Sequence, residues 1–239
     1  MHADVYEQCR GELVGFATRL VVRPEIAEEL AQEAALRLLD APDLPDDCAQ
    51  VRAWLFAVVS NLAIDHLRRH STWRELVLVD IRGRAEHDVE FVRAAQSLRG
   101  SPELQTIARE HLAVCLSCTL RNLPPEQAAA LLLKEVYEFT VTEVAGMLDA
   151  SAVQVKNWLQ HGRRRLEERY AASCALVAQE GVCYQCVELD GFFNGQARDP
   201  LEGTRRDVRA RLNVLRDSRT SDLGMWHRRL LELCDDLLS

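Results

Sequence analysis

Glycine and proline are scarce in this chain of 239 residues, which has 11 of the first and 7 of the second, and few segments alternate apolar with polar residues. Sheet proteins are typically rich in glycine and proline turns and in segments of alternating polarity. The chain is therefore expected to be nearly all helix. No apolar run approaches the ~20 residues of a membrane-spanning helix. The opening residues, MHADVYEQCRGE, lack the basic and then apolar pattern of a secretory signal. We therefore expect an all-α, cytoplasmic protein with no membrane segment.

A surplus of basic residues is also missing, because the formal net charge is -8. Arginine is nevertheless concentrated in three places, HLRRHSTWR (66–74), HGRRRLEER (161–169) and the segment 198–219. The acidic surplus lies elsewhere, as in EIAEELAQE (25–33). The distribution of charge matters more for nucleic-acid binding than its sum. Separate basic patches and an acidic face suit a protein that meets both DNA and a protein partner.

The first 70 residues show three helical patterns. Apolar residues recur at three- and four-residue steps through a first helix, from Tyr6 to Leu20. Pro24 suits the first turn of a second helix, which ends near Asp40. The apolar stripe of this second helix is predicted to be Ile26, Leu30, Ala34 and Leu38. A loop with two prolines and three aspartates (41–50) separates it from a third helix, over about 51–70.

The second half of the chain predicts a helix-turn-helix. A helix opening at Ser101 runs towards Leu120, and a proline pair at 124–125 starts the next one. The segment TVTE (140–143) has the spacing of a capping box, and Ser151 is placed to cap a long basic helix over about 152–171. The remaining residues carry two amphipathic helical patterns, at about 201–217 and 221–238.

Two stretches together identify a family. The first is EIAEELAQEAALRLLDA followed by VRAWLFAVVSNLAIDHLRRH, and the second is LPPEQAAALLLKEVYEFTVTEVAGMLDASAVQVKNWLQHGRRRLEERY. This pairing resembles the group 4, or extracytoplasmic function (ECF), sigma factors of bacterial RNA polymerase, over residues 5–75 and 120–171. The resemblance implies two small helical domains: one like sigma region 2 (1–75) and one like region 4 (120–172). A linker (76–119) joins them, and a helical extension (173–239) follows.

The resemblance also implies that the chain directs promoter recognition and transcription initiation by core RNA polymerase. No glycine-rich phosphate loop and no nucleophile–base arrangement is apparent in the sequence, so we expect no catalysis by the chain itself. By the same resemblance, the polar face of the second helix docks on the polymerase, where its acidic character complements a basic partner. A merely solvated face is the alternative. The polymerase-binding residues are predicted to be Glu28, Glu29, Gln32, Glu33 and Arg37.

The third helix, with the loop before it, is implied to bind the promoter −10 element as a single strand. An unstacked base needs a pocket with hydrogen-bonding groups, whereas arginines hold phosphates. The residues predicted for these roles are Asn61, Asp65, Arg68, Arg69 and Arg74. Trp54 and Phe56 have the ring faces to stack on bases, but aromatic residues at this spacing are more often core, and we favour core for Trp54.

The long basic helix is implied to recognise the −35 element in duplex DNA. We expect base-edge or phosphate contacts from the first five of the following residues and backbone contacts from the last two: Gln154, Lys156, Asn157, Gln160, His161, Arg163 and Arg164. Three positions depart from the family pattern. Asp149 stands where a turn glycine is common, Trp158 replaces a commonly basic residue and is expected to pack inward, and Gly162 weakens a helix interior.

Eight cysteines in a cytoplasmic chain favour metal or redox chemistry over a disulfide framework. His111, Cys115 and Cys118 share one helical face, and the spacing resembles the zinc fingerprint of zinc-binding anti-sigma factors. Cys183 and Cys186 form a second C-x2-C pair. We predict a zinc site, or a site for another thiolate-binding metal, from these five residues. Redox pairing and plain packing are the alternatives, and core or incidental positions are expected for the cysteines at 9, 48 and 234.

Two further interpretations stay open. The chain can be a stand-alone, metal- or redox-sensing helix-turn-helix regulator that binds duplex DNA without polymerase. The stretch like region 2 argues against this, because such a regulator has no need of it. The segment 201–238 can instead serve as an interaction module for a separate anti-sigma protein, or fold back over the DNA-binding surface.

Overall fold

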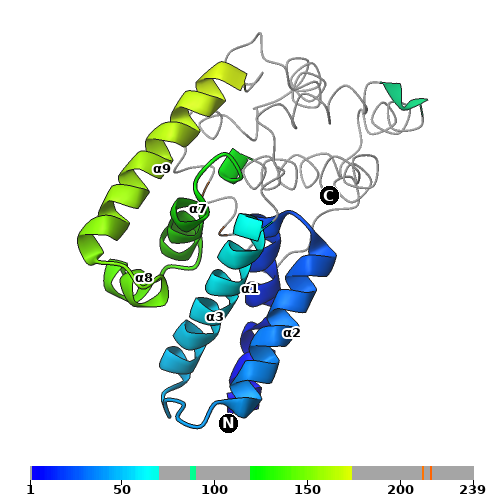
Figure 1. Ribbon diagram of the computed structural model, residues 1–239, viewed down its shortest axis with the longest axis vertical. Helices are drawn as coiled ribbons and strands as arrows, with labels where there is room; N and C mark the ends of the chain where they lie inside the picture. The colour runs from blue at the N-terminus through cyan, green and yellow to red at the C-terminus, as the bar shows by residue number, and fades with distance from the viewer. Residues whose placement is uncertain (1, 70–86, 90–118, 174–211, 213–215, 217–239) are drawn as a thin grey trace, which may run out of the picture.

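The computed structural model describes residues 2–69, 87–89 and 119–173, together with residues 212 and 216. Within these residues every regular element is helical, so the all-α prediction is confirmed. Figure 1 shows the helices in two groups that lie side by side. The first bundle comprises α1 (His2–Val21), α2 (Pro24–Asp40) and α3 (Cys48–Arg69), and the second comprises α7 (Pro125–Leu131), the π-helical turn η1 (Leu132–Val136), α8 (Val141–Met147) and α9 (Ala152–Ser173).

Several helix starts are set by single residues, as the sequence predicted. Pro24 is the first residue of α2, and it follows an extended residue. At the start of α8, the Thr140 side chain accepts a hydrogen bond from the backbone N–H of Glu143, whose carboxylate accepts one from the N–H of Thr140. The Ser151 hydroxyl accepts a hydrogen bond from the backbone N–H of Gln154 at the start of α9. These contacts satisfy N–H groups that have no partner within the helix.

Within the first bundle, α2 packs through a different stripe from the one predicted. Its fully buried residues are Ala27, Ala31, Ala34 and Leu38. Ile26 and Leu30 are only partly buried and flank this stripe. The predicted stripe was therefore displaced by one residue in the first two turns. Small alanine side chains let the backbone of α2 approach the neighbouring helices closely, and the larger residues then fill the sides of the contact.

The second bundle is held together by the apolar face of α9. Val155, Leu159 and Leu166 are buried on that face. Gly162 lies between them, and a β-carbon at this position would lie 2.6 Å from the Cδ1 atom of Leu131 in α7. The glycine that sequence reasoning treated only as a weak helix residue thus permits the close approach of α9 to α7.

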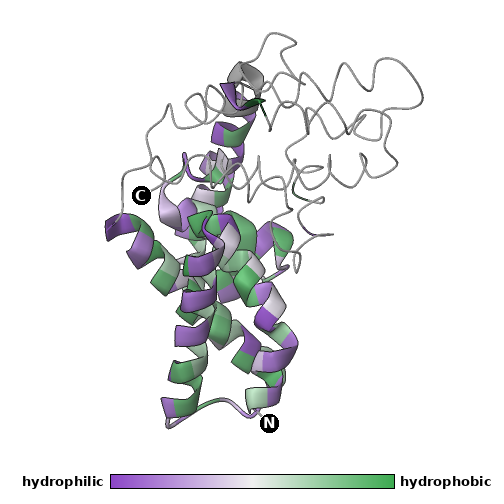
Figure 2. Cartoon of the chain, turned by 90° about the vertical axis from the view of Figure 1, so that its right-hand side faces the viewer, coloured by the Kyte–Doolittle hydropathy of each residue, from purple (hydrophilic) through white to green (hydrophobic). Residues whose placement is uncertain are grey.

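The two bundles share one continuous core. Phe16 of α1 and Phe56 of α3 meet Tyr137, which follows η1, with ring centroids 5.4 and 5.0 Å away. Phe139 lies 5.0 Å from Phe56 in the same cluster. In Figure 2 hydrophobic and hydrophilic bands alternate along the described helices, as expected of amphipathic helices. None of the described helices combines the length and apolar character needed to cross a membrane.

Candidate nucleic-acid interface

The outward face of α9 presents most of the residues predicted to contact duplex DNA. These residues are exposed on the described part of the helix: Gln154, Lys156, Asn157, Gln160, His161 and Arg164. Val153, which sequence reasoning overlooked, is 68% exposed on the same face. Trp158 is half-buried against the core, as predicted. A polar helix face beside an exposed aliphatic group is suited to the major groove, which offers hydrogen-bonding base edges and the thymine methyl group.

Arg163 differs in its surroundings from Arg164, the next residue of α9. It is half-buried and forms an ion pair with Glu135 of η1. Arg164 is exposed and lies 3.6 Å from Glu168, one helical turn further along. Arg163 therefore links α9 to η1, whereas Arg164 extends into solvent from the face described above.

The turn that precedes α9 contains a residue in the left-handed region. Asp149 has φ 47°, a conformation that glycine adopts freely and that aspartate and asparagine tolerate better than other residues. This geometry explains why glycine is common at this position in the family that the chain resembles, and why aspartate can replace it here. The turn directs α9 away from α8 and so positions the exposed face.

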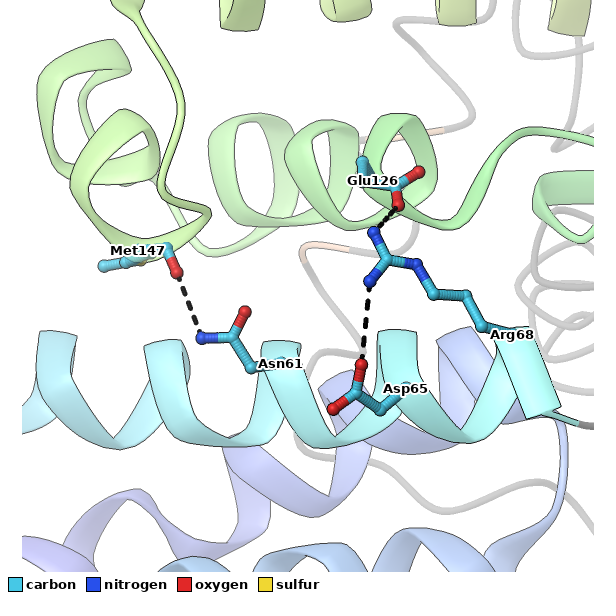
Figure 3. Close-up of polar contacts among 5 residues, drawn as sticks. All are labelled: Asn61, Asp65, Arg68, Glu126 and Met147. Carbon is cyan, nitrogen blue, oxygen red and sulfur yellow. Dashed lines mark hydrogen bonds and ion pairs between the residues drawn. The ribbon is translucent and has the colours of Figure 1, made fainter.

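A second polar face lies on α3, where Asn61, Asp65 and Arg68 follow one another at helical spacing (Figure 3). We call these three residues the α3 polar face. The Asn61 amide donates a hydrogen bond to the backbone oxygen of Met147, at the end of α8, over 3.4 Å. Arg68 lies 2.6 Å from Glu126 in the first turn of α7 and 3.6 Å from Asp65. Arg69 is exposed, and Arg74 lies outside the described residues.

The aromatic residues of α3 are core residues. Phe56 is fully buried, and Trp54 is half-buried against the same cluster, as favoured for Trp54. The Arg52 guanidinium lies over the rings of Phe56 and Phe139, 4.8 and 4.6 Å from their centroids. Arg52 also donates two hydrogen bonds to Glu12 of α1. Arg52 thus ties α1, α3 and the second bundle together, with a cation–π contact to one ring of each bundle.

The polar face of α2 carries alternating ion pairs and two exposed leucines. Glu28 pairs with Arg10 of α1 over 2.6 Å, and Glu33 pairs with Arg37 over 2.8 Å. Glu29 and Gln32 are exposed on the same face. Beside them, Leu36 is 58% and Leu39 is 73% exposed, and sequence reasoning missed both. Large aliphatic side chains held in solvent among charged residues are typical of a surface that binds another protein.

The cysteines in the described part of the chain differ in environment. Burial raises the pKa of the Cys9 thiol to about 11, so this group stays protonated and unreactive near neutral pH. Cys48 is exposed at the first residue of α3. No group of three or more potential metal ligands occurs among the described residues. The predicted ligands, namely His111, Cys115, Cys118, Cys183 and Cys186, all lie outside those residues.

Two residues of the C-terminal segment are described by the structure, and one of them contacts the second bundle. Leu212 is buried in the shared core. Arg216, four positions later in the sequence, donates hydrogen bonds through Nε and a terminal nitrogen to the backbone oxygen of Glu135, at 3.1 and 2.5 Å. Its other terminal nitrogen lies 3.4 Å from the carboxylate of Glu138, a residue with φ 64°. Arg216 thus braces the turn between η1 and α8.

Comparison with protein families decides the identity of the two bundles. The model of sigma-70 region 2 matches residues 5–72, and the model of sigma-70 region 4 matches residues 113–166. The chain belongs to the ECF sigma factors of the sigma-70 family. The first bundle corresponds to region 2 and the second to region 4, in the order expected from the sequence. The first bundle is therefore called region 2, and the second is called region 4.

Individual ECF sigma factors are similar to this chain over long stretches. The "Probable ECF RNA polymerase sigma factor SigI" of Mycobacterium tuberculosis is 28% identical over 212 residues, covering 86% of this chain and 69% of that protein. Residues 1–172 are less than three quarters of the chain, so this match includes part of the C-terminal extension. SigX of Bacillus subtilis is 26% identical over 69% of this chain and 79% of its own length. SigM of the same organism is 25% identical over 70% of this chain and 93% of its own length.

Proposed function

We propose that this chain binds core RNA polymerase and directs it to promoters, as an initiation factor that catalyses no step itself. One observation carries the proposal. A single chain combines an acidic, partly apolar face on α2, a polar face on α3 and an exposed reading face on α9, in the order of sigma regions 2 and 4. The polymerase supplies the chemistry of nucleotide addition. Its location is then that of the polymerase, in the cytoplasm.

The α2 face is assigned to polymerase docking. Glu29 and Gln32 provide exposed polar groups, and Leu36 and Leu39 provide apolar area that becomes buried on binding. Burial of apolar surface contributes roughly 25 cal/mol per Å², so two leucines contribute affinity while the charges set orientation. The ion pairs that Glu28 and Glu33 form with arginines keep these carboxylates in fixed positions.

The DNA-reading roles are divided between α3 and α9. In α9, Gln154, Asn157 and Gln160 carry amide groups that suit adenine or other base edges in the major groove. In α3, Asn61 supplies an amide for an unstacked base, and Arg68 and Arg69 supply positive charge for phosphates. Strand separation at the −10 element becomes favourable because these groups bind the single strand and not the duplex.

We further propose that the cysteines regulate this activity through zinc or another thiolate-binding metal. The proposal is supported by the sequence spacing of His111, Cys115 and Cys118 and of the pair Cys183 and Cys186. Replacing Cys183 and Cys186 by serine is expected to lower the bound metal measured by mass spectrometry of the purified protein and to change transcript yield, with polymerase affinity retained. Unchanged metal content would show that Cys183 and Cys186 are not ligands of the metal.

The sigma role is tested by run-off transcription with core polymerase on fragmented genomic DNA of the source bacterium, using protein purified without oxygen, with and without zinc or chelator. Discrete transcripts that require the chain are expected. Absence of transcripts in every metal state, together with duplex binding by the chain alone, would favour the stand-alone regulator. Pull-down from a lysate of the source bacterium, with and without metal, tests for a separate anti-sigma protein, which the C-terminal extension is proposed to accommodate.

A further inference from the structure

Val153 is an exposed aliphatic residue at the second position of α9. Its side chain is 68% exposed. Among the described residues of region 4 it is the one large hydrophobic side chain that is exposed. Figure 1 shows α9 at the outer edge of the described helices, with α7 and α8 packed along one side of it. The other side of α9 is therefore accessible to a partner.

Val153 lies on the side of α9 that points away from the core. The buried residues of α9 are spaced by four, three and four positions, so they form one ridge along the helix: Val155, Leu159, Gly162 and Leu166. A second set of residues repeats this spacing and is exposed: Val153, Asn157, Gln160 and Arg164. The two ridges are offset by two residues, which is about 200° of rotation in an α-helix, so they point in opposite directions. We call the exposed set the outer ridge of α9.

The local needs of the helix do not account for a valine at position 153. Valine has a lower helix propensity than alanine or the straight-chain residues, and the first turn of a helix favours acidic side chains. A β-branched side chain does have one strongly preferred conformation in a helix, so the two methyl groups of Val153 are held in fixed positions. A rigid apolar group that is held in solvent on a polar face is suited to contact with a ligand.

The first half of α9 is the part that fits the major groove of DNA. Residues 152–161 contain no acidic side chain, and Lys156 adds positive charge. Glu167 and Glu168 follow on the exposed side of the second half, where they repel phosphate groups. In a helix-turn-helix, the N-terminal residues of the recognition helix contact the base edges. Val153 is therefore among the residues of α9 that lie nearest to the bases.

The chemistry of the outer ridge fits A·T base pairs. In the major groove, thymine presents its 5-methyl group, an apolar group that no other standard base has. Adenine presents a donor and an acceptor that suit the amide of asparagine or glutamine. Asn157 and Gln160 carry such amides, and Val153 carries methyl groups. Because cytosine lacks the 5-methyl group, a contact with Val153 distinguishes thymine from cytosine.

We propose that Val153 is a specificity-determining residue of this sigma factor and selects a thymine in the −35 element by contact with its 5-methyl group. The inference rests on the proposed function, and it deepens that function by naming a residue and the base that it selects. Arg164, on the same ridge, binds the DNA backbone and adds affinity without sequence preference. Val153 adds the preference.

The first arm of the test removes the methyl group from the DNA. The probe is a duplex carrying a promoter mapped by run-off transcription, in which each thymine of the −35 element, on either strand, is replaced in turn by deoxyuridine. Deoxyuridine pairs as thymine does and lacks only the 5-methyl group. Affinity is measured with the full chain bound to core polymerase. We expect one position at which the replacement weakens binding about three- to fourfold, the effect of burying one methyl group.

The second arm removes the methyl groups from the protein. Val153→Ala is expected to bind the thymine and deoxyuridine duplexes equally, because the shorter side chain does not reach the base. Alanine favours the helix, so loss of α9 does not explain this result. Val153→Thr keeps one methyl group, and its preference for thymine is expected to be intermediate. Val89→Ala is the matched control, because Val89 is also 68% exposed and lies outside α9, and it is expected to keep the original preference.

The outcomes separate this inference from the proposed function. A deoxyuridine effect that is the same in Val153→Ala and in the original chain at every position would overturn the selection of thymine by Val153. A −35 element without an A·T pair would overturn it as well. Failure to map any promoter would instead overturn the sigma role. Duplexes selected by the full chain alone from a randomised library would then replace the promoter in both arms and still decide whether Val153 selects a thymine.

Discussion

At the scale of single residues, Asp149 and Ser151 show how the turn before α9 is encoded. Ser151 was predicted as a helix cap from its place in the sequence, and its hydroxyl accepts the expected hydrogen bond. Asp149 was noticed only as a departure from a glycine, and the structure supplies the reason with its φ of 47°. A helix cap depends on neighbouring residues and can be predicted from the sequence. A backbone dihedral angle in a turn depends on how the two flanking helices are packed.

This turn gives a prediction on stability. Asp149→Val is expected to lower the free energy of unfolding by about 1–2 kcal/mol, because a β-branched residue is strained in the left-handed region. Asp149→Gly relieves that strain and is expected to leave stability within about 1 kcal/mol of the original chain. Chemical denaturation followed by circular dichroism measures both. Equal stability of the valine and glycine variants would contradict the assigned backbone conformation.

At the scale of elements, the helix patterns were readable, but the orientation of α2 was not. Periodicity located the helix from Pro24 to Asp40 and its polar side. It placed Ile26 and Leu30 at the centre of the buried stripe, because large apolar residues dominate any hydrophobic average. The structure instead buries Ala27 and Ala31, since close helix packing favours small side chains at the contact. The same rotation leaves Leu36 exposed, which no local pattern signals.

The exposed leucines of α2 predict an effect on polymerase binding. Leu36→Glu is expected to weaken affinity for core polymerase by about tenfold, since it removes apolar contact area and buries a charge at the proposed interface. Gln8→Glu adds the same charge on the exposed side of α1 and serves as the matched control. Surface plasmon resonance with immobilised core polymerase measures both. Equal affinity of the two variants would remove the α2 face from the docking surface.

At the scale of the whole molecule, sequence reasoning found both regions and missed their contact. Phe56, Tyr137 and Phe139 lie in separate segments of the sequence and are all buried in the structure. Periodicity predicts that a residue is buried but does not identify the residue it packs against. The pair of Arg68 and Glu126 joins residues 58 positions apart, and single-sequence patterns carry no information on such pairs. The partners of the α3 polar face therefore emerged only from the folded structure.

The C-terminal extension is linked to this contact through Arg216, which braces the turn carrying Tyr137 and Phe139. Arg216→Ala is expected to lower the free energy of unfolding by about 1–3 kcal/mol, because it removes the hydrogen bonds from a charged group to the backbone oxygen of Glu135. Arg216→Lys keeps the charge but loses the forked donor geometry. Its stability is expected to fall between that of Arg216→Ala and that of the original chain. Chemical denaturation followed by circular dichroism measures these variants, and unchanged stability of Arg216→Ala would show that Arg216 does not brace the turn.

In the proposed function, the two regions read two promoter elements together, as part of the polymerase holoenzyme. Hydroxyl-radical footprinting of the chain on a mapped promoter, with and without core polymerase, tests it most directly. Two separate protected patches that require polymerase, the downstream one extending over melted DNA, are the predicted result. A single duplex patch that is the same with and without polymerase would contradict the account and identify a stand-alone regulator.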